Sequence, residues 1–336
     1  MIKIDNGENF KKILLNYDIF LFDMFGVVWS GNKKIEGTNE TLEFLQKNNK
    51  IVYFLSNSPT SNDSLKQEFE DMGIYQNKHY NGIVTSGDVL NNSLKTKNIQ
   101  FDSNKNPKNC YIFGPIDKDI LNNINYNITK DIKEADFIIL GFPQLSLEEY
   151  NKLDKKKYKD LVFESPMYEE SYYDSLTIDV FMDKIKEIKK YNLPIINNCA
   201  DLVAMQPSKN NSVLHYVIRH GTIAKKYREL GGEVIEMSKP HSMIYDLAFN
   251  RICENFNCSR DNLKNKKISM IGDTVDTDIL GATNASKYLG ITVDGILTLS
   301  GVSGRDFNKN INEIEKYCLD KNLNLNYIVD SLGTIL

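Results

Sequence analysis

Short apolar runs alternate with longer amphipathic segments over the first part of the chain. The runs have the length and continuous apolar character of buried strands, and they are Ile19–Phe22, Ile51–Leu55 and Gly82–Thr85. Between the second and third runs, residues 61–72 have helical spacing and are followed by Gly73, a residue typical of a helix C-terminus. Strands that alternate with helices predict an α/β fold with a parallel, doubly wound, Rossmann-like sheet.

A second alternating set begins after the polar segment 101–108, which contains Pro107 and is expected to be a linker. Its expected strands are Tyr111–Phe113, Phe137–Leu140, Leu161–Phe163 and Pro194–Ile196. A helix in the same region has a single apolar face, formed by Ile178, Phe181, Met182, Ile185 and Ile188. Such a face is typical of core packing, so the middle of the chain predicts a second α/β domain.

The first pattern resumes after the Gly231-Gly232 pair. Its expected strands are Val234–Met237, Ile268–Ile271 and Ile296–Leu299. The simplest organisation is therefore a discontinuous core, residues 1–103 and 233–336, into which residues 104–232 are inserted as an α/β cap domain.

The composition is that of an ordinary globular protein, with 41% hydrophobic and 26% charged residues in a chain of 336. A net charge of −4 argues against general nucleic-acid binding. No apolar stretch approaches the ~18 residues that span a bilayer, and the N-terminus lacks the pattern of a signal peptide.

The five cysteines have no zinc-ligand spacing and are interpreted as reduced thiols of a cytoplasmic protein. We expect neither a nucleic-acid nor a membrane partner, and the sequence leaves a homo-oligomer open.

The first candidate for chemistry is Asp23, which directly follows the apolar run Ile19–Phe22. Gly26 indicates a sharp turn just beyond it. Asp23 is therefore expected at the end of a parallel strand, where open α/β sheets carry their binding sites. An aspartate at a strand end is common, but similar polar segments follow other expected strands.

Four such segments occur in order along the chain: Asp23–Gly31, Phe54–Ser58, Ser238–His241 and Ile271–Ile279. Together they resemble the motifs of the haloacid dehalogenase (HAD) superfamily, and in particular its class IIA branch of NagD-like and p-nitrophenylphosphatase-like proteins. The run Ile296–Val302 and the long insertion between the second and third motifs also resemble that branch. The resemblance implies a hydrolase of phosphate monoesters. Read singly, the same residues are also consistent with turn caps and solvated loops.

The resemblance assigns the role of nucleophile to Asp23, since a carboxylate can attack phosphorus and form an aspartyl-phosphate. The phosphoryl group requires hydrogen-bond donors and a cation, which Ser56, Asn57 and Lys239 can supply. Lys239 is expected to assist catalysis by neutralising charge on the phosphate and on Asp23. Because it is a flexible charged residue before Pro240, it is not expected to stabilise the core.

The resemblance also implies a Mg²⁺ site, because this ion prefers hard oxygen ligands. The candidate ligands are the carboxylates of Asp23 and Asp273 and the backbone carbonyl at Phe25, a position whose carbonyl the family uses. Asp278 is expected either to support this site or to stabilise the N-terminus of a helix that begins at Thr277-Asp278.

Phe25 departs from the family's phosphatases, which carry a second aspartate two residues after the nucleophile. That aspartate protonates the leaving group and then activates water, and a phenylalanine cannot transfer a proton. The family's dehalogenases also have an aromatic residue at this position, but they need no metal. Asp273 and Asp278 therefore favour metal-dependent phosphoryl chemistry over dehalogenation.

Two further residues are candidates for supporting roles. His241 titrates near neutrality when unperturbed and could donate the missing proton, although a structural role after Lys239-Pro240 is also consistent with its position. Asn198-Cys199-Ala200-Asp201 resembles the Asn-Pro-Asp segment of the branch, and Asp201 matches its acid.

The sequence thus predicts a Mg²⁺-dependent phosphohydrolase that acts on a small phosphorylated metabolite through an aspartyl-phosphate at Asp23. The alternative is a binding or regulatory protein that keeps the phosphate and metal site but hydrolyses poorly, for which Phe25 is the main support. Dehalogenation is a third alternative.

Overall fold

The computed structural model describes residues 2–30, 33–101, 106–209 and 211–336. Gly31 of the first motif and residues 102–105 of the predicted linker lie outside these ranges. The chain divides into two units. The first, here the core unit, comprises Met1–Ser56, Asn62–Thr85 and Lys239–Leu336, and the second, here the insert unit, comprises Asn57–Ser61 and Ser86–Ser238.

This division assigns residues 57–61, 86–103 and 233–238 to the insert unit, whereas the predicted ranges had placed them in the core. Helix α4 (Ser86–Thr96) packs on the short helix η1 (Lys118–Leu121), and the side-chain amide of Asn91 donates to the carbonyl of Ile120 at 2.7 Å. Strand β16 (Val234–Glu236) pairs in parallel with β13 (Ile195–Asn197) of the insert unit. The prediction that this strand resumes the core pattern was therefore wrong.

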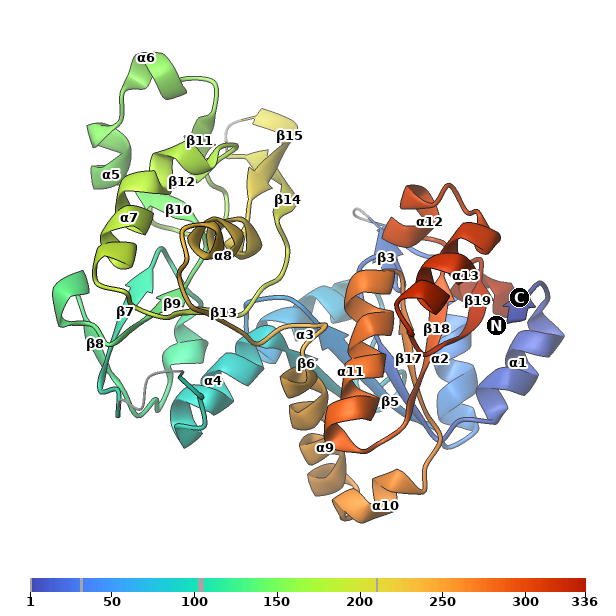
Figure 1. The fold of residues 1–336 in the computed structure, drawn as a ribbon. Helices are drawn as coiled ribbons and strands as arrows, with labels where there is room; N and C mark the ends of the chain where they lie inside the picture. Colours follow the sequence, from blue (N-terminus) through green and yellow to red (C-terminus); the bar gives the residue numbers. More distant parts are fainter. Residues whose placement is uncertain (1, 31–32, 102–105, 210) are drawn as a thin grey trace. The chain divides into compact units, whose positions relative to one another are not determined.

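The core unit contains a seven-stranded sheet, shown in Figure 1. Its strands in spatial order are β1 (Ile2–Ile4), β19 (Leu325–Val329), β18 (Val293–Thr298), β17 (Ile268–Gly272), β2 (Ile19–Phe22), β5 (Ile51–Ser56) and β6 (Gly82–Thr85). Every neighbouring pair is parallel. The parallel, doubly wound sheet predicted from the alternating pattern is confirmed.

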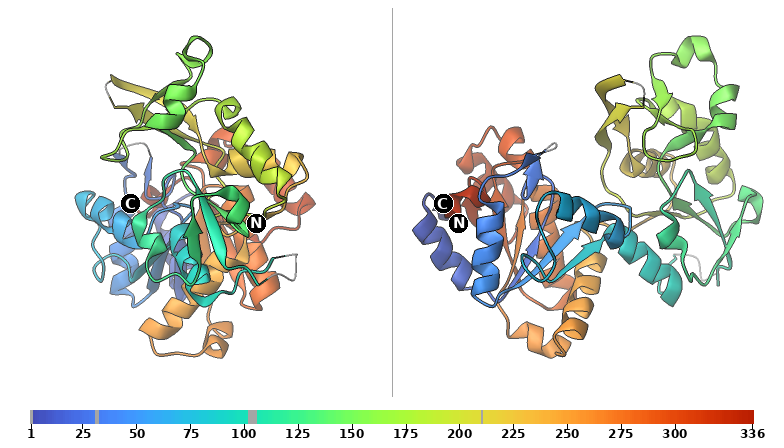
Figure 2. Two further views of the ribbon diagram at one scale, coloured as in Figure 1. Left: turned by 90° about the vertical axis from the view of Figure 1, so that its left-hand side faces the viewer. Right: turned by 180° about the vertical axis from the view of Figure 1, so that it is seen from behind.

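Helices cover both faces of this sheet (Figures 1 and 2). One face carries α1 (Gly7–Leu15), α2 (Thr38–Lys47) and α3 (Asn62–Asp71), and the other carries α9 (Ser242–Asn255), α11 (Leu280–Leu289) and α13 (Ile311–Asp320). Apolar side chains of the helices, such as Leu42, Leu45 and Phe69, are fully buried against the central strands. None of the helices among the described residues combines the length and apolar composition needed to cross a bilayer.

Short elements complete the core unit. They are β3 (Trp29–Ser30), β4 (Lys33–Lys34), α10 (Arg260–Lys264), the π-helix η4 (Val275–Ile279), α12 (Val302–Asp306) and the 3₁₀ helix η5 (Leu332–Ile335). Two of them, η4 and α12, follow strands β17 and β18 directly and so lie at the carboxyl end of the sheet.

The insert unit has its own five-stranded parallel sheet in the order β16, β13, β9 (Phe137–Leu140), β7 (Asn109–Phe113) and β8 (Asn127–Thr129). The 3₁₀ helices η2 (Ile132–Glu134) and η3 (Ile178–Phe181) and the helices α7 (Met182–Lys190) and α8 (His220–Glu229) accompany it. Phe181, Ile185 and Ile188 of the predicted apolar face are buried in the core of this unit, as the spacing indicated.

The predicted strand at 161–163 does not belong to that parallel sheet. The observed strand β11 (Val162–Glu164) lies in an antiparallel sheet with β12 (Tyr172–Ser175) and β10 (Gln144–Ser146). The helices α5 (Leu147–Lys152) and α6 (Lys155–Tyr158) connect β10 to β11 along the chain. The hairpin of β14 (Val203–Ser208) and β15 (Asn211–Ile218) was not predicted. Its first strand alternates between exposed and half-buried residues and contains Pro207, so it lacks an apolar run.

Candidate active site

Three predicted residues lie at the carboxyl ends of neighbouring core strands. Asp23 follows β2, Ser56 is the last residue of β5, and Asp273 follows β17. The backbone N–H of Asp23 donates to the carbonyl of Ile271 at 2.8 Å, which extends the pairing of β2 and β17 by one residue. Parallel pairing therefore brings Asp23 and Asp273 to the same edge of the sheet, as the strand-end pattern predicted.

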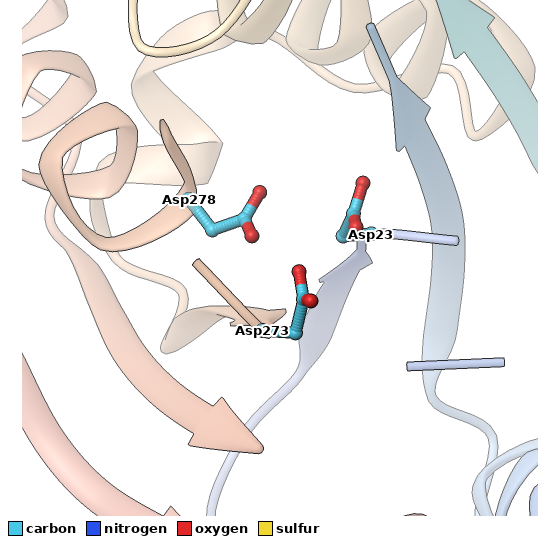
Figure 3. Close-up of side chains that lie close together, drawn as sticks. All are labelled: Asp23, Asp273 and Asp278. Atoms are coloured by element: carbon cyan, nitrogen blue, oxygen red, sulfur yellow. The ribbon is translucent and has the colours of Figure 1, made fainter. Parts of the chain in front are cut away.

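Asp23, Asp273 and Asp278 converge into one acidic cluster, shown in Figure 3. One carboxylate oxygen of each residue lies within 4.8 Å of the corresponding oxygens of the other two. Asp273 and Asp278 are buried and Asp23 is half-buried. Carboxylate oxygens gathered at this distance can hold a hard divalent cation.

Three glycines allow the backbone to approach the cluster closely. A Cβ atom at Gly26, where φ is +79°, would lie 2.2 Å from Oδ2 of Asp273, and one at Gly301 would lie 1.9 Å from the same oxygen. A Cβ at Gly272 would lie 2.2 Å from the Cβ of Asp278. Any side chain at these positions would enter the space of the carboxylates, so the cluster depends on glycine at all three.

Lys239 lies inside the cluster and not in solvent. Its Nζ donates to Oδ1 of Asp23 at 2.5 Å, to Oδ1 of Asp278 at 2.8 Å and to the carbonyl of Leu55 at 3.0 Å. The side chain of Lys239 is only 2% exposed. The prediction that Lys239 makes no contribution to the core was therefore wrong, because the neighbouring carboxylates supply the partners that a buried ammonium group needs.

The cluster holds more negative than positive groups, and this affects its protonation. Burial raises the pKa of Asp23 above its ordinary value; Lys239 opposes this rise, and the charges of Asp278 and Asp273 add to it. Burial and the charge of Asp278 raise the pKa of Asp273 to about 6. Burial lowers the pKa of Lys239, but Asp23 and Asp278 outweigh it and raise that pKa above its ordinary value. Lys239 therefore stays protonated at neutral pH, and when all three carboxylates are ionised they carry two more negative charges than Lys239 balances.

Asp278 lies in the π-helix Val275–Ile279, which leads into α11. Its Oδ1 accepts from Lys239 at 2.8 Å and its Oδ2 accepts from the backbone N–H of Thr274 at 3.1 Å. Asp278 thus contacts Lys239 and also accepts from a backbone donor before the helix; its predicted support of a metal site stays a prediction.

Asp273 is held by the loop before α12 and by its own neighbour. Its Oδ2 accepts from the backbone N–H of Val302 at 2.6 Å, and its Oδ1 accepts from the Thr274 hydroxyl at 2.9 Å. Ser303 anchors the same loops, because its Oγ accepts from the N–H of Val275 at 2.9 Å and its N–H donates to the carbonyl of Asp273 at 3.0 Å. The sequence analysis placed Thr274 in the fourth motif and Val302 at the end of the run Ile296–Val302 but gave neither a role, and Ser303 lies just beyond that run.

The residues present fit a divalent metal ion. Three carboxylates lie together beside one ammonium group, all the candidate ligand atoms are hard oxygens, and the glycines leave room for the carboxylate of Asp273 in the cluster. A carboxylate that accepts one or two hydrogen bonds still has lone pairs for a cation.

Phe25 follows Asp23 by two residues and is 52% exposed, so it is not part of the hydrophobic core. The turn around it is fixed by backbone hydrogen bonds, including one from the N–H of Gly26 to the carbonyl of Trp29 at 2.6 Å. Trp29 packs edge-on against Phe69 with ring centroids 5.4 Å apart, so its role is packing. An exposed aromatic ring thus stands at the position where the family resemblance leads us to expect an acid.

The core unit brings together Asp23, Lys239, Asp273 and Asp278, with Ser56 on the strand beside Asp23. His241 is exposed and is the N-cap residue of α9, but its side chain does not cap that helix. Asn57 and Asp201 belong to the insert unit, and Asp201 accepts a backbone hydrogen bond from Gly221 at 3.0 Å.

Two family models match the parts of the sequence that carry this cluster. The model described as haloacid dehalogenase-like hydrolase matches residues 20–127, and the model described as HAD-hydrolase-like matches residues 236–334. The chain belongs to the haloacid dehalogenase-like hydrolases, which confirms the family that its four ordered motifs predicted.

Similar proteins support this membership along most of the chain. Phosphoglycolate phosphatase 1A of Arabidopsis thaliana is 23% identical over 307 residues, which cover 87% of this chain and 73% of the relative. The structure of 4-nitrophenylphosphatase from Thermotoga maritima is 20% identical, covers 96% of this chain and 97% of its own, and has a TM-score of 0.59. The structure of glycerol phosphate phosphatase from Mycobacterium tuberculosis, in complex with magnesium, is 16% identical and has a TM-score of 0.55. The match covers 86% of this chain and 70% of that one. At these identities the two structures show the shared fold.

Proposed function

We propose that this protein is a Mg²⁺-dependent phosphohydrolase that cleaves phosphate monoesters of small metabolites through an aspartyl-phosphate at Asp23. One observation carries the proposal: a single buried ammonium group, that of Lys239, contacts both Asp23 and Asp278 beside the carboxylate of Asp273. A nucleophile next to a fixed cation and a pair of acidic groups is what phosphoryl transfer to a carboxylate requires.

Asp23 acts as the nucleophile. The hydrogen bonds found among the described residues use one of its carboxylate oxygens, Oδ1, which Lys239 holds in place. Its other oxygen is then oriented for attack on phosphorus, while the phosphoester bond to the leaving group breaks. Lys239 keeps its proton and neutralises charge on both the carboxylate and the phosphoryl group.

The carboxylates of Asp23 and Asp273 and the backbone carbonyl of Phe25 are the residues that would hold Mg²⁺. When bound, the ion supplies positive charge that neutralises phosphoryl oxygens. Asp278 orients Lys239 through Oδ1. The hydroxyl of Ser56 and the amide of Asn57 are proposed as phosphate donors, on the sequence pattern alone.

Phe25 limits what the site can do to the leaving group. Its ring has no proton to give, and general acid catalysis is typically worth ~10²–10⁴-fold in rate. We propose that the natural substrate is an ester whose leaving group departs without full protonation, or that His241 supplies the proton.

The substrate class is proposed from the site and from the similar proteins. The similar proteins are named as phosphatases of phosphoglycolate, 4-nitrophenyl phosphate and glycerol phosphate, and each of these compounds is a small phosphate ester. A small phosphorylated metabolite is therefore the proposed substrate. A cytoplasmic location is proposed from the reduced-thiol interpretation of the five cysteines.

The second candidate function is a binding or regulatory protein with the same phosphate and metal site. The exposed Phe25 in place of an acid favours it. A dehalogenase would have no need of the acidic pair Asp273 and Asp278, so it is the weaker alternative.

Turnover of a panel of aryl and alkyl phosphate esters, with Mg²⁺ and with a chelator, tests the proposal. We expect Mg²⁺-dependent release of phosphate, fastest from p-nitrophenyl phosphate. Binding of Mg²⁺ and phosphate without turnover of any ester would favour the binding protein, and chloride release from a haloacid without metal would favour the dehalogenase.

A further inference from the structure

The C-terminal end of α9 carries two cysteines on either side of the helix terminus. The helix ends at Asn255, Phe256 is the C-cap, and Asn257 has a left-handed backbone with φ of +49°. The N–H of Cys258 donates to the carbonyl of Cys253 at 3.0 Å. This hydrogen bond and the left-handed residue define a Schellman motif, in which the side chains at the positions of Cys253 and Cys258 commonly touch.

The two thiols are neighbours at this helix end, since the backbones of Cys258 and Cys253 are joined by a hydrogen bond and the Cys258 side chain contributes to the raised pKa of Cys253. Both cysteines are half-buried and lie among the exposed residues Glu254–Asn257, whereas Cys110, Cys199 and Cys318 are buried. A small oxidant in solvent therefore reaches the Cys253–Cys258 pair before it reaches the other three.

The proton arrangement of the pair suits a two-step oxidation. Burial and the hydrogen bond with Cys258 raise the pKa of Cys253 to about 11, so Cys253 keeps its proton at neutral pH and can donate it to the Cys258 sulfur. The charge of Arg260 lowers the pKa of Cys253, but burial and the hydrogen bond outweigh it. Because Cys253 keeps its proton, Cys258 is the sulfur proposed to react first with the oxidant.

We propose that Cys253 and Cys258 form a redox-active dithiol, which a hydroperoxide converts into an intramolecular disulfide. The Cys258 thiolate attacks one peroxide oxygen, the O–O bond breaks, and Cys258 becomes a sulfenic acid while the released oxyanion takes up a proton. The Cys253 sulfur then attacks the Cys258 sulfur, the S–O bond breaks, and hydroxide leaves with the Cys253 proton as water. The two thiols lose two electrons in total, and the peroxide accepts them.

The disulfide can form without refolding of the helix end. The side-chain amide of Asn255 donates to the hydroxyl of Tyr53 on β5, which holds the last turn of α9 against the sheet. The hydrogen bond from Cys258 to Cys253 holds the other side. A disulfide needs a short separation between the backbones of its two cysteines, and the 3.0 Å hydrogen bond from the N–H of Cys258 to the carbonyl of Cys253 brings these backbones together.

The sequence offers a direct test. Trypsin cleaves after Arg251 and Arg260, and the peptide 252–260 contains both cysteines and no other. The full-length protein is treated with hydrogen peroxide, its remaining thiols are alkylated, and the digest is analysed by mass spectrometry. We expect this peptide to escape alkylation and to lose two hydrogen atoms, at a rate about tenfold or more above thiol loss at the buried cysteines. Dithiothreitol should restore both thiols.

Variants separate a dithiol from two independent thiols. In Cys258→Ser the peptide should never lose two hydrogens, while the control Cys318→Ser should behave like the wild type. Oxidation of 252–260 to sulfinic acid without a disulfide, or thiol loss no faster than at Cys110 and Cys199, would overturn the proposal even if no variant folds, since the wild type alone shows both. The readout is independent of phosphatase activity.

Discussion

The ammonium group of Lys239 lies 2.8 Å from Oδ1 of Asp278, and the two side chains are only 2% and 1% exposed. The pair joins the loop before α9 to the π-helix before α11. The Tyr245 hydroxyl of α9 donates to the carbonyl of Asp278 at 3.2 Å and reinforces the same contact. Lys239, which is proposed to neutralise the phosphoryl group, is thus also part of the packing between two helices.

Replacing Lys239 with Met is expected to destabilise the fold and to weaken oxyanion binding. Removal of one partner from a buried ion pair leaves carboxylates without a counter-charge, which costs on the order of 3 kcal/mol. Chemical denaturation measures the loss, and vanadate titration measures binding. Lys266→Met, at a lysine whose side chain is 50% exposed, should change neither. An unchanged unfolding midpoint in Lys239→Met would mean that the ion pair contributes nothing to stability.

Asp23→Asn is expected to abolish hydrolysis of p-nitrophenyl phosphate while leaving the protein folded. The amide keeps the shape of the side chain but removes the nucleophile, so kcat should fall by about 10³-fold or more. The control is Asp276→Asn, since that exposed carboxylate of the fourth motif pairs with Lys321 and not with the cluster. Turnover in the Asp23 variant near the wild-type rate would refute the aspartyl-phosphate.

The rate of hydrolysis should fall steeply as the pKa of the leaving group rises, because Phe25 cannot protonate it. Phe25→Asp should then raise alkyl-phosphate hydrolysis by about 10²-fold, within the usual range for general acid catalysis. Since Phe25 is 52% exposed, its replacement by a charged residue should cost little stability. Equal wild-type rates on aryl and alkyl esters would instead indicate another proton donor, and His241→Asn would test it.

Gly26→Ala is expected to disturb the acidic cluster directly, in addition to the loss of stability that its backbone strain causes. The new Cβ would lie 2.2 Å from Oδ2 of Asp273. Gly290→Ala is a matched control, since Gly290 also has a positive φ, +65°, but a Cβ there meets nothing within 4 Å. Both variants should lose about 1 kcal/mol from backbone strain. Only Gly26→Ala should lower Mg²⁺ affinity, by about tenfold, as measured by calorimetry.

The stabilising effect of Mg²⁺ should increase with pH. The pKa of Asp273 is raised from 3.8 to about 6 in the fold, so the metal-free folded state holds a proton that the unfolded state releases. This carboxyl therefore favours folding at low pH, and its contribution is lost as pH rises from about 4 through about 6. Mg²⁺ would compensate the ionised group.

Thermal midpoints measured with and without Mg²⁺ at about pH 5 and about pH 7 test this relationship. The gain from Mg²⁺ should be larger at the higher pH, and Asp273→Asn should remove most of the difference. If Mg²⁺ raised the thermal midpoint equally at both pH values, the ionisation of Asp273 would not be coupled to metal binding.

Much of the core follows from local patterns in the sequence. Continuous apolar runs such as Ile19–Phe22 form central strands, because a parallel strand covered on both faces needs apolar side chains at every position. Asp23 and Asp273 were also predictable, since a polar residue directly after such a run lies at the carboxyl end of the sheet. The edge strand β1 and its neighbour β19 were missed because the polar residues Lys3 and Asn326 interrupt their apolar runs.

Other properties depend on which strands and loops become neighbours. The sequence around Lys239 indicates a flexible loop, and only the fold supplies Asp23 and Asp278 as the partners that make its burial favourable. Strand β16 matches the core pattern in composition, but its hydrogen bonds to β13 decide that it belongs to the insert unit. Backbone pairing is non-local, so apolar content cannot assign a strand to a sheet.

The sequence by itself determined the fold class, the family and the residue types of the site, because hydrophobic period and motif order are local. Tertiary structure alone decided the geometry, since the distance among three carboxylates depends on strand register and on glycines far apart in the chain, Gly26 and Gly301. It likewise decided the contact between Cys253 and Cys258, which a left-handed Asn257 creates where the sequence shows only two separate thiols.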